Sequence, residues 1–593
     1  TDYTKYLTSS GCVFDGSYFK IKQIQLGYSF PKQLIKKVAI ENLRIYGSLE
    51  DFFTFTDYPG FDPEVTGVGN SLGVDKGSYP NSKKVVLGLC EDKLDIPQKG
   101  VLDFSTYYKT DEQAQAAADA LYIQLKGTYY NYTMMKNALS DDVWAGGGGR
   151  NDNAELEGCN EYSFGSDQSF IGGVWESYYQ LIYKANVILG RVEPDTDLKK
   201  KACAEAKFFR AFAYFDLVSM WGDVPLVDHE LDKSEYQLAR SPKADIWALI
   251  ERDLTEAINS GLLEEKKSVD DKTTWRVTTQ LAQARLGKAY LWQEKFHEAA
   301  VVLNEVRASG KYKLYDGNYE DILTYKAEYN CESMLESNRI FDASNSMDEF
   351  SFFEVMNHWR TDKLDMSGSN NQFNGTGWGF MVPQKKLYDA FVQEEGVDGY
   401  RLNQTMKTYD QISQLGVKVA KGQSLINEGY FMWKRRFSNV ESPAGFWCSY
   451  NNYRWMRYAE VLLLAAEANL KDGNQSEADA CLNEVRQRAR LDAKTATLDA
   501  IKLEKRLELC SEYTRYQDII RWKDAEALLK DQGERTPILS NKAGKDEPDN
   551  VAVEYIQYNK DKTRYGFKER HYLLPIPAKE IRLNPNMEQN AGW

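Results

Sequence analysis

The sequence predicts a mainly α-helical protein built on tetratricopeptide-like helical hairpins and preceded by a short β-strand fragment. Helical hydrophobic periodicity is sustained from Cys90 almost to the end of the 593 residues. Two later segments repeat the small-residue pattern of packed helical hairpins. The first 89 residues instead carry the aromatic and β-branched runs that are typical of strands. We therefore divide the chain into residues 1–89 and residues 90–593.

The N-terminal segment contains three strand-like runs. Residues 18–30 (YFKIKQIQLGYSF) and 42–56 (NLRIYGSLEDFFTFT) are rich in aromatic and β-branched residues, and 84–89 form a shorter apolar run. A loop rich in Gly, Pro and Asp, residues 57–82, separates the last two runs. Three strands leave unpaired edges and cannot bury a stable core alone, so this segment reads as a fragment of a larger sheet.

Four helices are predicted in the first part of the helical region. Thr110-x-x-Gln113 is a capping box, in which each side chain satisfies a free backbone N–H at the start of a helix. Pro225 cannot continue a helix and ends the third one. The predicted helices cover residues 110–130, 170–192, 200–221 and 241–260.

Two helical hairpins are predicted near 278–309 and 453–490. Both place small residues where two helices cross, followed by a short turn, which is a degenerate tetratricopeptide pattern. In the first hairpin these positions include Gly287 and Ala299, and in the second Ala466 and Gly473.

Composition excludes several classes of protein. A net charge of −14 without a basic stripe repels phosphate backbones, so nucleic acid is not an expected partner. The eight cysteines are scattered, with no CxxC and only four histidines in the chain, which argues against a metal site. No apolar run has the length of a membrane-spanning helix. We expect neither a cofactor nor a metal.

No catalytic motif has the structural context that it needs. Residues 69–73 (GNSLG) fit G-x-S-x-G, but they lie in a loop without the strand–turn–helix of a nucleophile elbow. Glu508, Glu512, Arg515, Asp518 and Arg521 follow helical spacing, and we interpret them as ion pairs that fix helix packing. The expected protein is therefore not an enzyme.

Residues 27–31 (GYSFP), 42–65 and 77–89 resemble the last strands of a SusC-type TonB-dependent receptor, an outer-membrane β-barrel. The family pattern is not complete. Glu50-Asp51 stands where Gln-Asn is usual, and the chain runs on into Cys90 instead of ending at a terminal aromatic residue.

Nearly all of residues 90–593 resemble the SusD/RagB family of nutrient-binding outer-membrane lipoproteins. The order and spacing of several segments carry this resemblance. It implies a scaffold of tetratricopeptide-like hairpins with a loop-rich binding half, located on the bacterial cell surface. The segments are 206–227, 284–300, 457–473, 482–490, 504–522 and 572–593.

Leu87-Gly88-Leu89-Cys90 resembles a loose lipobox, followed by acidic Glu91 and Asp92. The SusD/RagB resemblance implies that Cys90 carries a lipid, which would hold the protein at the outer membrane. Leu before the cysteine and the short apolar stretch favour an inert linker thiol instead. Joined to the receptor-like strands, the chain reads as a fusion across two neighbouring genes, either an assembly artefact or a functional product.

Two aromatic–polar segments are candidates for a glycan site. Sugar rings stack their C–H face on flat aromatics, and their hydroxyls need fixed donors and acceptors. Residues 141–152 (DDVWAGGGGRND) offer all of these in one loop, as do residues 357–378 with Asn370, Asn371, Gln372 and Asn374. The resemblance implies a site at comparable loops. The predicted ligand-binding residues are Asp142, Trp144, Arg150, Trp175, Trp359 and Trp378.

The resemblance implies non-catalytic binding of an oligosaccharide or starch-like glycan. The protein would deliver this ligand to a SusC-type TonB-dependent barrel as its partner. Three alternatives stay open: another nutrient such as peptide, a purely structural lid, and a glycoside hydrolase whose carboxylate pair sequence cannot locate.

Overall fold

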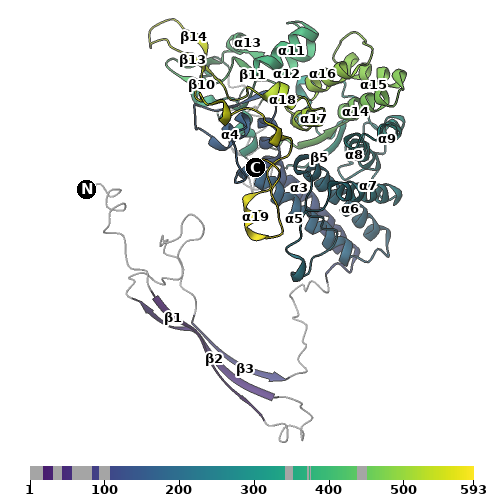
Figure 1. Ribbon diagram of the computed structural model, residues 1–593, viewed down its shortest axis with the longest axis vertical. Helices are drawn as coiled ribbons and strands as arrows, with labels where there is room; N and C mark the ends of the chain where they lie inside the picture. The colour runs from purple at the N-terminus through teal and green to yellow at the C-terminus, as the bar shows by residue number, and fades with distance from the viewer. Residues whose placement is uncertain are drawn as a thin grey trace, which may run out of the picture. The chain divides into compact units, whose positions relative to one another are not determined.

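The computed structural model describes residues 18–30, 43–56, 83–91, 107–340, 352–369, 373, 376–436 and 450–593. The chain divides into two compact units, Thr1–Ser105 and Thr106–Trp593 (Figure 1). Two sequence features lie outside the described residues: the G-x-S-x-G match at 69–73, and the polar residues Asn370, Asn371, Gln372 and Asn374.

The first unit contains an antiparallel sheet in the order β1–β2–β3, which confirms the three predicted strands. At 12 and 14 residues, β1 and β2 are longer than the usual strand of about six. Apolar side chains on this sheet are exposed, with Leu26 at 83% and Leu87 at 84%. β3 continues through Cys90, whose backbone lies opposite Arg44. The strands are β1 (Tyr18–Ser29), β2 (Leu43–Thr56) and β3 (Lys84–Glu91).

The second unit begins with the four helices predicted from the sequence. The Thr110–Gln113 capping box is present, with both reciprocal hydrogen bonds. The first helix runs on to Ala138 because its last turns are buried in the core, including Met134 and Met135. The four are α3 (Asp111–Ala138), α5 (Ser169–Arg191), α6 (Asp197–Trp221) and α7 (Lys243–Asn259).

Both predicted hairpins are present, and α9 of the first packs against α14 of the second. A Cβ at Gly287 would lie 2.5 Å from Leu303 Cγ, so only glycine allows these helices to cross this closely. The second prediction was wrong at its start, because Tyr453–Arg457 form strand β12, which pairs with β5. The elements are α8 (Thr279–Trp292), α9 (Phe296–Ala308), α14 (Tyr458–Lys471), α15 (Gln475–Arg488) and β5 (Ser333–Ser337).

The remainder of this unit consists of short strands and helices joined by long loops. Figure 1 shows α6–α9 stacked on one side and the small sheet β10–β13–β14 on the other. β4 and β7 pair antiparallel beside it. The elements used below are β4 (Val143–Gly146), α4 (Ala154–Glu161), β7 (Phe380–Pro383), α11 (Lys385–Glu395), β10 (Ser424–Ile426), β11 (Tyr430–Met432), α16 (Leu498–Glu508), α17 (Arg515–Arg521), β13 (Thr536–Asn541) and β14 (Val551–Ile556).

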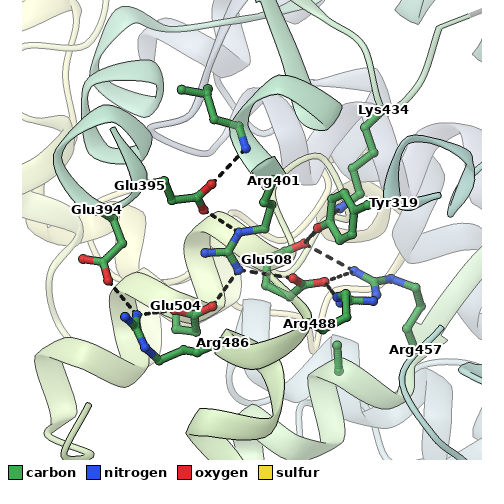
Figure 2. A network of polar contacts seen from close by, with 12 residues as sticks. Tyr319, Glu394, Glu395, Arg401, Lys434, Arg457, Arg486, Arg488, Glu504 and Glu508 are labelled. Atoms are coloured by element: carbon green, nitrogen blue, oxygen red, sulfur yellow. Dashed lines mark hydrogen bonds and ion pairs between the residues drawn. The ribbon is translucent and has the colours of Figure 1, made fainter. Parts of the chain in front are cut away.

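A buried network of ion pairs connects the helical hairpins with the loop-rich part of this unit (Figure 2). Glu508, at the end of α16, is 0% exposed and pairs with Arg401 at 3.2 Å, Arg457 at 3.0 Å, and Arg488. Burial raises the pKa of Glu508, but these guanidinium groups outweigh burial and lower that pKa to about 2. The predicted packing role of Glu508 is confirmed, although its partners come from other elements and not from its own helical neighbours.

Candidate ligand-binding face

The glycines after Trp144 bring the 141–152 loop close to β7. Gly146 has φ +80°, and a Cβ there would lie 2.2 Å from the Gly379 oxygen. The Gly147 N–H donates to that same oxygen at 2.6 Å, and the Gly147 oxygen accepts from Ile426 N–H at 2.9 Å. The structure uses Gly146 and Gly147 for close backbone approach, which only glycine permits.

Trp144 lies on β4 beside a group of polar and aromatic side chains. Its Nε1–H donates to Glu428 Oε2 at 2.9 Å, and the hydroxyl of Tyr555 donates to Glu428 Oε1 at 2.5 Å. The rings of Tyr388 and Tyr430 lie next to each other, 4.6 Å between centroids. Tyr555 is 47% exposed, and the other four side chains are half-buried. We name this set, Trp144, Tyr388, Glu428, Tyr430 and Tyr555, the Trp144 face.

The two tyrosine hydroxyls of the Trp144 face at Tyr430 and Tyr555 have raised pKa values. Burial raises the pKa of Tyr430 to about 12, and the nearby Glu428 and Tyr388 add to the shift. The pKa of Tyr555 is raised by burial and by its hydrogen bond to Glu428. Both phenols therefore stay protonated near neutral pH and can donate hydrogen bonds.

Sequence reasoning found Trp144 but missed the other members of the Trp144 face. Tyr388 comes from α11, Tyr430 from β11 and Tyr555 from β14, while Glu428 precedes β11. β14 (VAVEYI) gave little signal, because Tyr555 is its only aromatic residue. The pairing of that strand with β13 then brings Tyr555 to Glu428.

Two of the predicted ligand-binding residues make ion pairs within the protein. Asp142 is 1% exposed and accepts from Arg506 Nε–H at 2.7 Å; burial raises the pKa of this carboxyl. The Arg150 guanidinium binds Glu161 at 2.9 Å and approaches Glu157 at 3.2 Å, both on α4. Both residues anchor the loop that carries Trp144, and direct ligand contact by them stays a prediction.

The other three predicted tryptophans pack against core side chains. Trp359 is 5% exposed, packs on Phe373 and donates through Nε1–H to the Met432 oxygen at 3.2 Å. Trp378 is half-buried against the main core. Trp175 is 2% exposed, and part of it lines a cavity of about 400 Å³ along the middle of α5. Ligand contact by these three residues likewise stays a prediction.

In the part of the chain that the structure describes, no group of three or more His, Cys, Asp and Glu side chains is placed to hold a metal ion. No helix among these residues has both the length and the apolar character needed to cross a bilayer.

Two family models match this chain. The model described as "SusD family" matches residues 349–593, and the one described as "Starch-binding associating with outer membrane" matches residues 101–291. SusD-like protein P2 of Formosa agariphila is 24% identical over 85% of this chain and 97% of its own length. A SusD-like protein of Bacteroides ovatus is 26% identical over 74% of this chain and 80% of its own.

Another relative belongs to a different class. TonB-dependent receptor P3 of Formosa agariphila is 38% identical over 88 residues, which are 14% of this chain and 9% of that receptor.

Solved structures with the same fold include proteins that bind glycans. A laminarin-binding SusD-like protein superposes with a TM-score of 0.68 at 28% identity, covering 82% of this chain and 100% of its own. Surface glycan-binding protein A of Bacteroides thetaiotaomicron, solved with laminarihexaose, gives 0.63 at 22% identity, covering 81% and 99%. The stacked helical hairpins and the loop-rich half agree with both family models, and residues 101–291 and 349–593 of this chain are similar to SusD-type proteins.

Proposed function

We propose that this protein binds an oligosaccharide at the bacterial cell surface without cleaving it. It then passes the ligand to a SusC-type TonB-dependent transporter in the outer membrane. The observation that carries the proposal is the Trp144 face, where exposed and half-buried aromatic rings surround the Glu428 carboxylate. Rings accept the C–H face of a sugar, while a fixed carboxylate and phenol hydroxyls bind its hydroxyl groups.

The proposed ligand class is a neutral glucan. The laminarin-binding structural neighbour and the starch-binding description of one family model both support a glucose polymer. A neutral ligand also suits Glu428, because this carboxylate would repel an anionic sugar but accepts hydrogen bonds from hydroxyl groups.

Replacing Tyr555 with alanine is expected to lower the affinity for laminarihexaose or maltohexaose about tenfold, or about 1.4 kcal/mol. The substitution removes both the ring and its hydroxyl from the face. It costs little folding stability, because Tyr555 is 47% exposed. Isothermal titration calorimetry measures the change. Tyr236→Ala is the matched control, since Tyr236 is 64% exposed and lies outside the face. Equal affinity for the Tyr555→Ala and wild-type proteins would rule out this face.

The same oligosaccharides also test the other functions open to this fold. New reducing ends after incubation would reveal a glycoside hydrolase, and binding of peptides alone would assign a different nutrient. If the protein bound no glycan and no peptide, a purely structural lid would be the remaining function.

For the N-terminal part, we propose that residues 1–89 derive from the end of a SusC-type receptor and that Cys90 carries a lipid. The 88-residue match to a TonB-dependent receptor and the long antiparallel strands support the first point. Mass spectrometry of protein from the native cell is expected to find diacylglycerol on Cys90. Recovery of an unmodified peptide across residues 84–100 would show that Cys90 is a linker thiol without a lipid.

A further inference from the structure

A groove of about 800 Å³ opens among the helices of the scaffold. It is lined by the ends of α6, α8, α14 and α17, the start of α7, and residues near the C-terminus of the chain. Its volume lies within the usual range for small-ligand sites, about 300–1,000 Å³. It shares no lining residue with the Trp144 face. We name it the Trp522 groove.

Aromatic rings supply flat apolar surface in the Trp522 groove. Trp292, Trp522 and Tyr572 are all half-buried and line it. The ring of Trp522 is partly open to this space. Its Nε1–H donates to Glu467 at 3.1 Å, which fixes the orientation of the ring. Trp292 stacks on Trp247, which also lines the groove, with 6.4 Å between the ring centroids.

The charge of the Trp522 groove is opposite to that of the chain. Six cations line it against three carboxylates, although the whole chain carries −14. One of those carboxylates, Glu467, already accepts two hydrogen bonds from Arg521, both at 2.6 Å, and is 2% exposed. Apart from this pair, five cations and two carboxylates line the groove. The cations are Arg240, Lys243, Lys471, Lys502, Arg521 and Lys523.

Two of the six lysine and arginine side chains are available to a ligand. Lys243 and Lys471 are exposed, and neither forms an ion pair with any residue that the structure describes. Lys502, by contrast, pairs with Asp524 at 2.7 Å, and the Lys523 ammonium lies 4.3 Å from the centre of the Tyr572 ring. Cations without a protein partner in a concave, partly apolar site attract anionic groups.

We propose that the Trp522 groove binds an anionic oligosaccharide, one that carries carboxylate or sulfate groups. The rings of Trp292, Trp522 and Tyr572 would stack on the C–H faces of its sugar units, and Lys243 and Lys471 would bind its charges. An acidic peptide offers the same charges but no flat C–H faces to match three rings. The groove would thus recognise a ligand class different from that of the Trp144 face.

Calorimetry of the full chain tests this proposal with four ligands: trigalacturonic acid, its methyl ester, a sulfated galactan tetrasaccharide and hexaglutamate. At least one of the two anionic saccharides is expected to bind, with an affinity that falls as salt rises because charges carry part of the binding. The uncharged ester is expected to bind at least tenfold more weakly than the acid. Binding by the acid alone or by the sulfated sugar alone identifies the anionic group.

Substitutions in the Trp522 groove test whether the anionic saccharide binds there. Lys243→Ala combined with Lys471→Ala is expected to lower the affinity at least tenfold, whereas the double Lys→Arg variant retains most of it. Lys272→Ala is the control, because Lys272 is exposed and lies outside the groove. Tyr555→Ala is expected to leave anionic binding unchanged, which separates this proposal from the function proposed for the Trp144 face.

Four results would overturn the proposal: no binding of either anionic saccharide, equal binding of the ester and the acid, full affinity in the double alanine variant, or hexaglutamate binding as tightly as the saccharides. The last result would assign the Trp522 groove to an acidic peptide instead.

Discussion

Replacing Glu508 with alanine is expected to destabilise the protein by about 3–5 kcal/mol, the usual cost of removing one partner from a buried ion pair. Glu508 is fully buried among Arg401, Arg457 and Arg488 (Figure 2). Without its carboxylate these guanidinium groups keep their charge but lose a shared counter-ion in a site that water does not reach. Urea denaturation followed by circular dichroism measures the loss.

The control for this substitution is Glu554→Ala. Glu554 pairs with Lys542 on the surface, where both side chains are about half exposed. Such pairs contribute at most about 1 kcal/mol because solvent screens them. If the Glu508 variant lost no more stability than the Glu554 variant, the network would not hold the helices together.

Acid is expected to unfold the protein through the same network. The guanidinium groups hold the pKa of Glu508 at about 2, and Arg457 with Lys434 does the same for Glu512, each against the opposing effect of burial. Because the folded pKa lies below the unfolded value of about 4.4, each carboxylate stabilises the fold above that value. This contribution, roughly 3 kcal/mol for each group, is lost as the pH falls from about 4.4 to 2.

Thermal unfolding between pH 7 and pH 2 measures this dependence. The melting temperature is expected to stay nearly level down to about pH 5 and then to fall steeply. In Glu508→Gln, which cannot ionise, the slope between pH 4.4 and pH 2 should be shallower. A variant as steep as the wild type would place the acid sensitivity in other carboxylates.

Features that depend on residues close together in the sequence could be predicted from it. The capping box at Thr110 and the small residue at Gly287 are local signals, and both appear in the structure as expected. The Tyr453–Arg457 stretch was mistaken for helix because it adjoins a strongly helical run, and its strand partner β5 lies over a hundred residues earlier.

Partners that lie far apart in the chain could not be identified from sequence. The acidic and basic residues after Glu504 have the right spacing for pairs within one helix, yet Glu508 reaches Arg401 on another element. Trp144 was identified from its own loop, but Tyr388, Glu428 and Tyr555 join it only through folding. The ion pair by which Asp142 holds that loop also could not be identified, because its partner Arg506 lies far away in the sequence.

The close approach of Gly146 to Gly379 has a consequence for ligand choice. A backbone that is already fixed loses little conformational entropy when a sugar arrives, so more of the contact energy appears as affinity. If the Trp144 face binds a glucan as proposed, substituting side chains on this preorganised support would alter which linkage is accepted without refolding the loop. Related proteins with the same backbone would thus differ in the glycan that they bind.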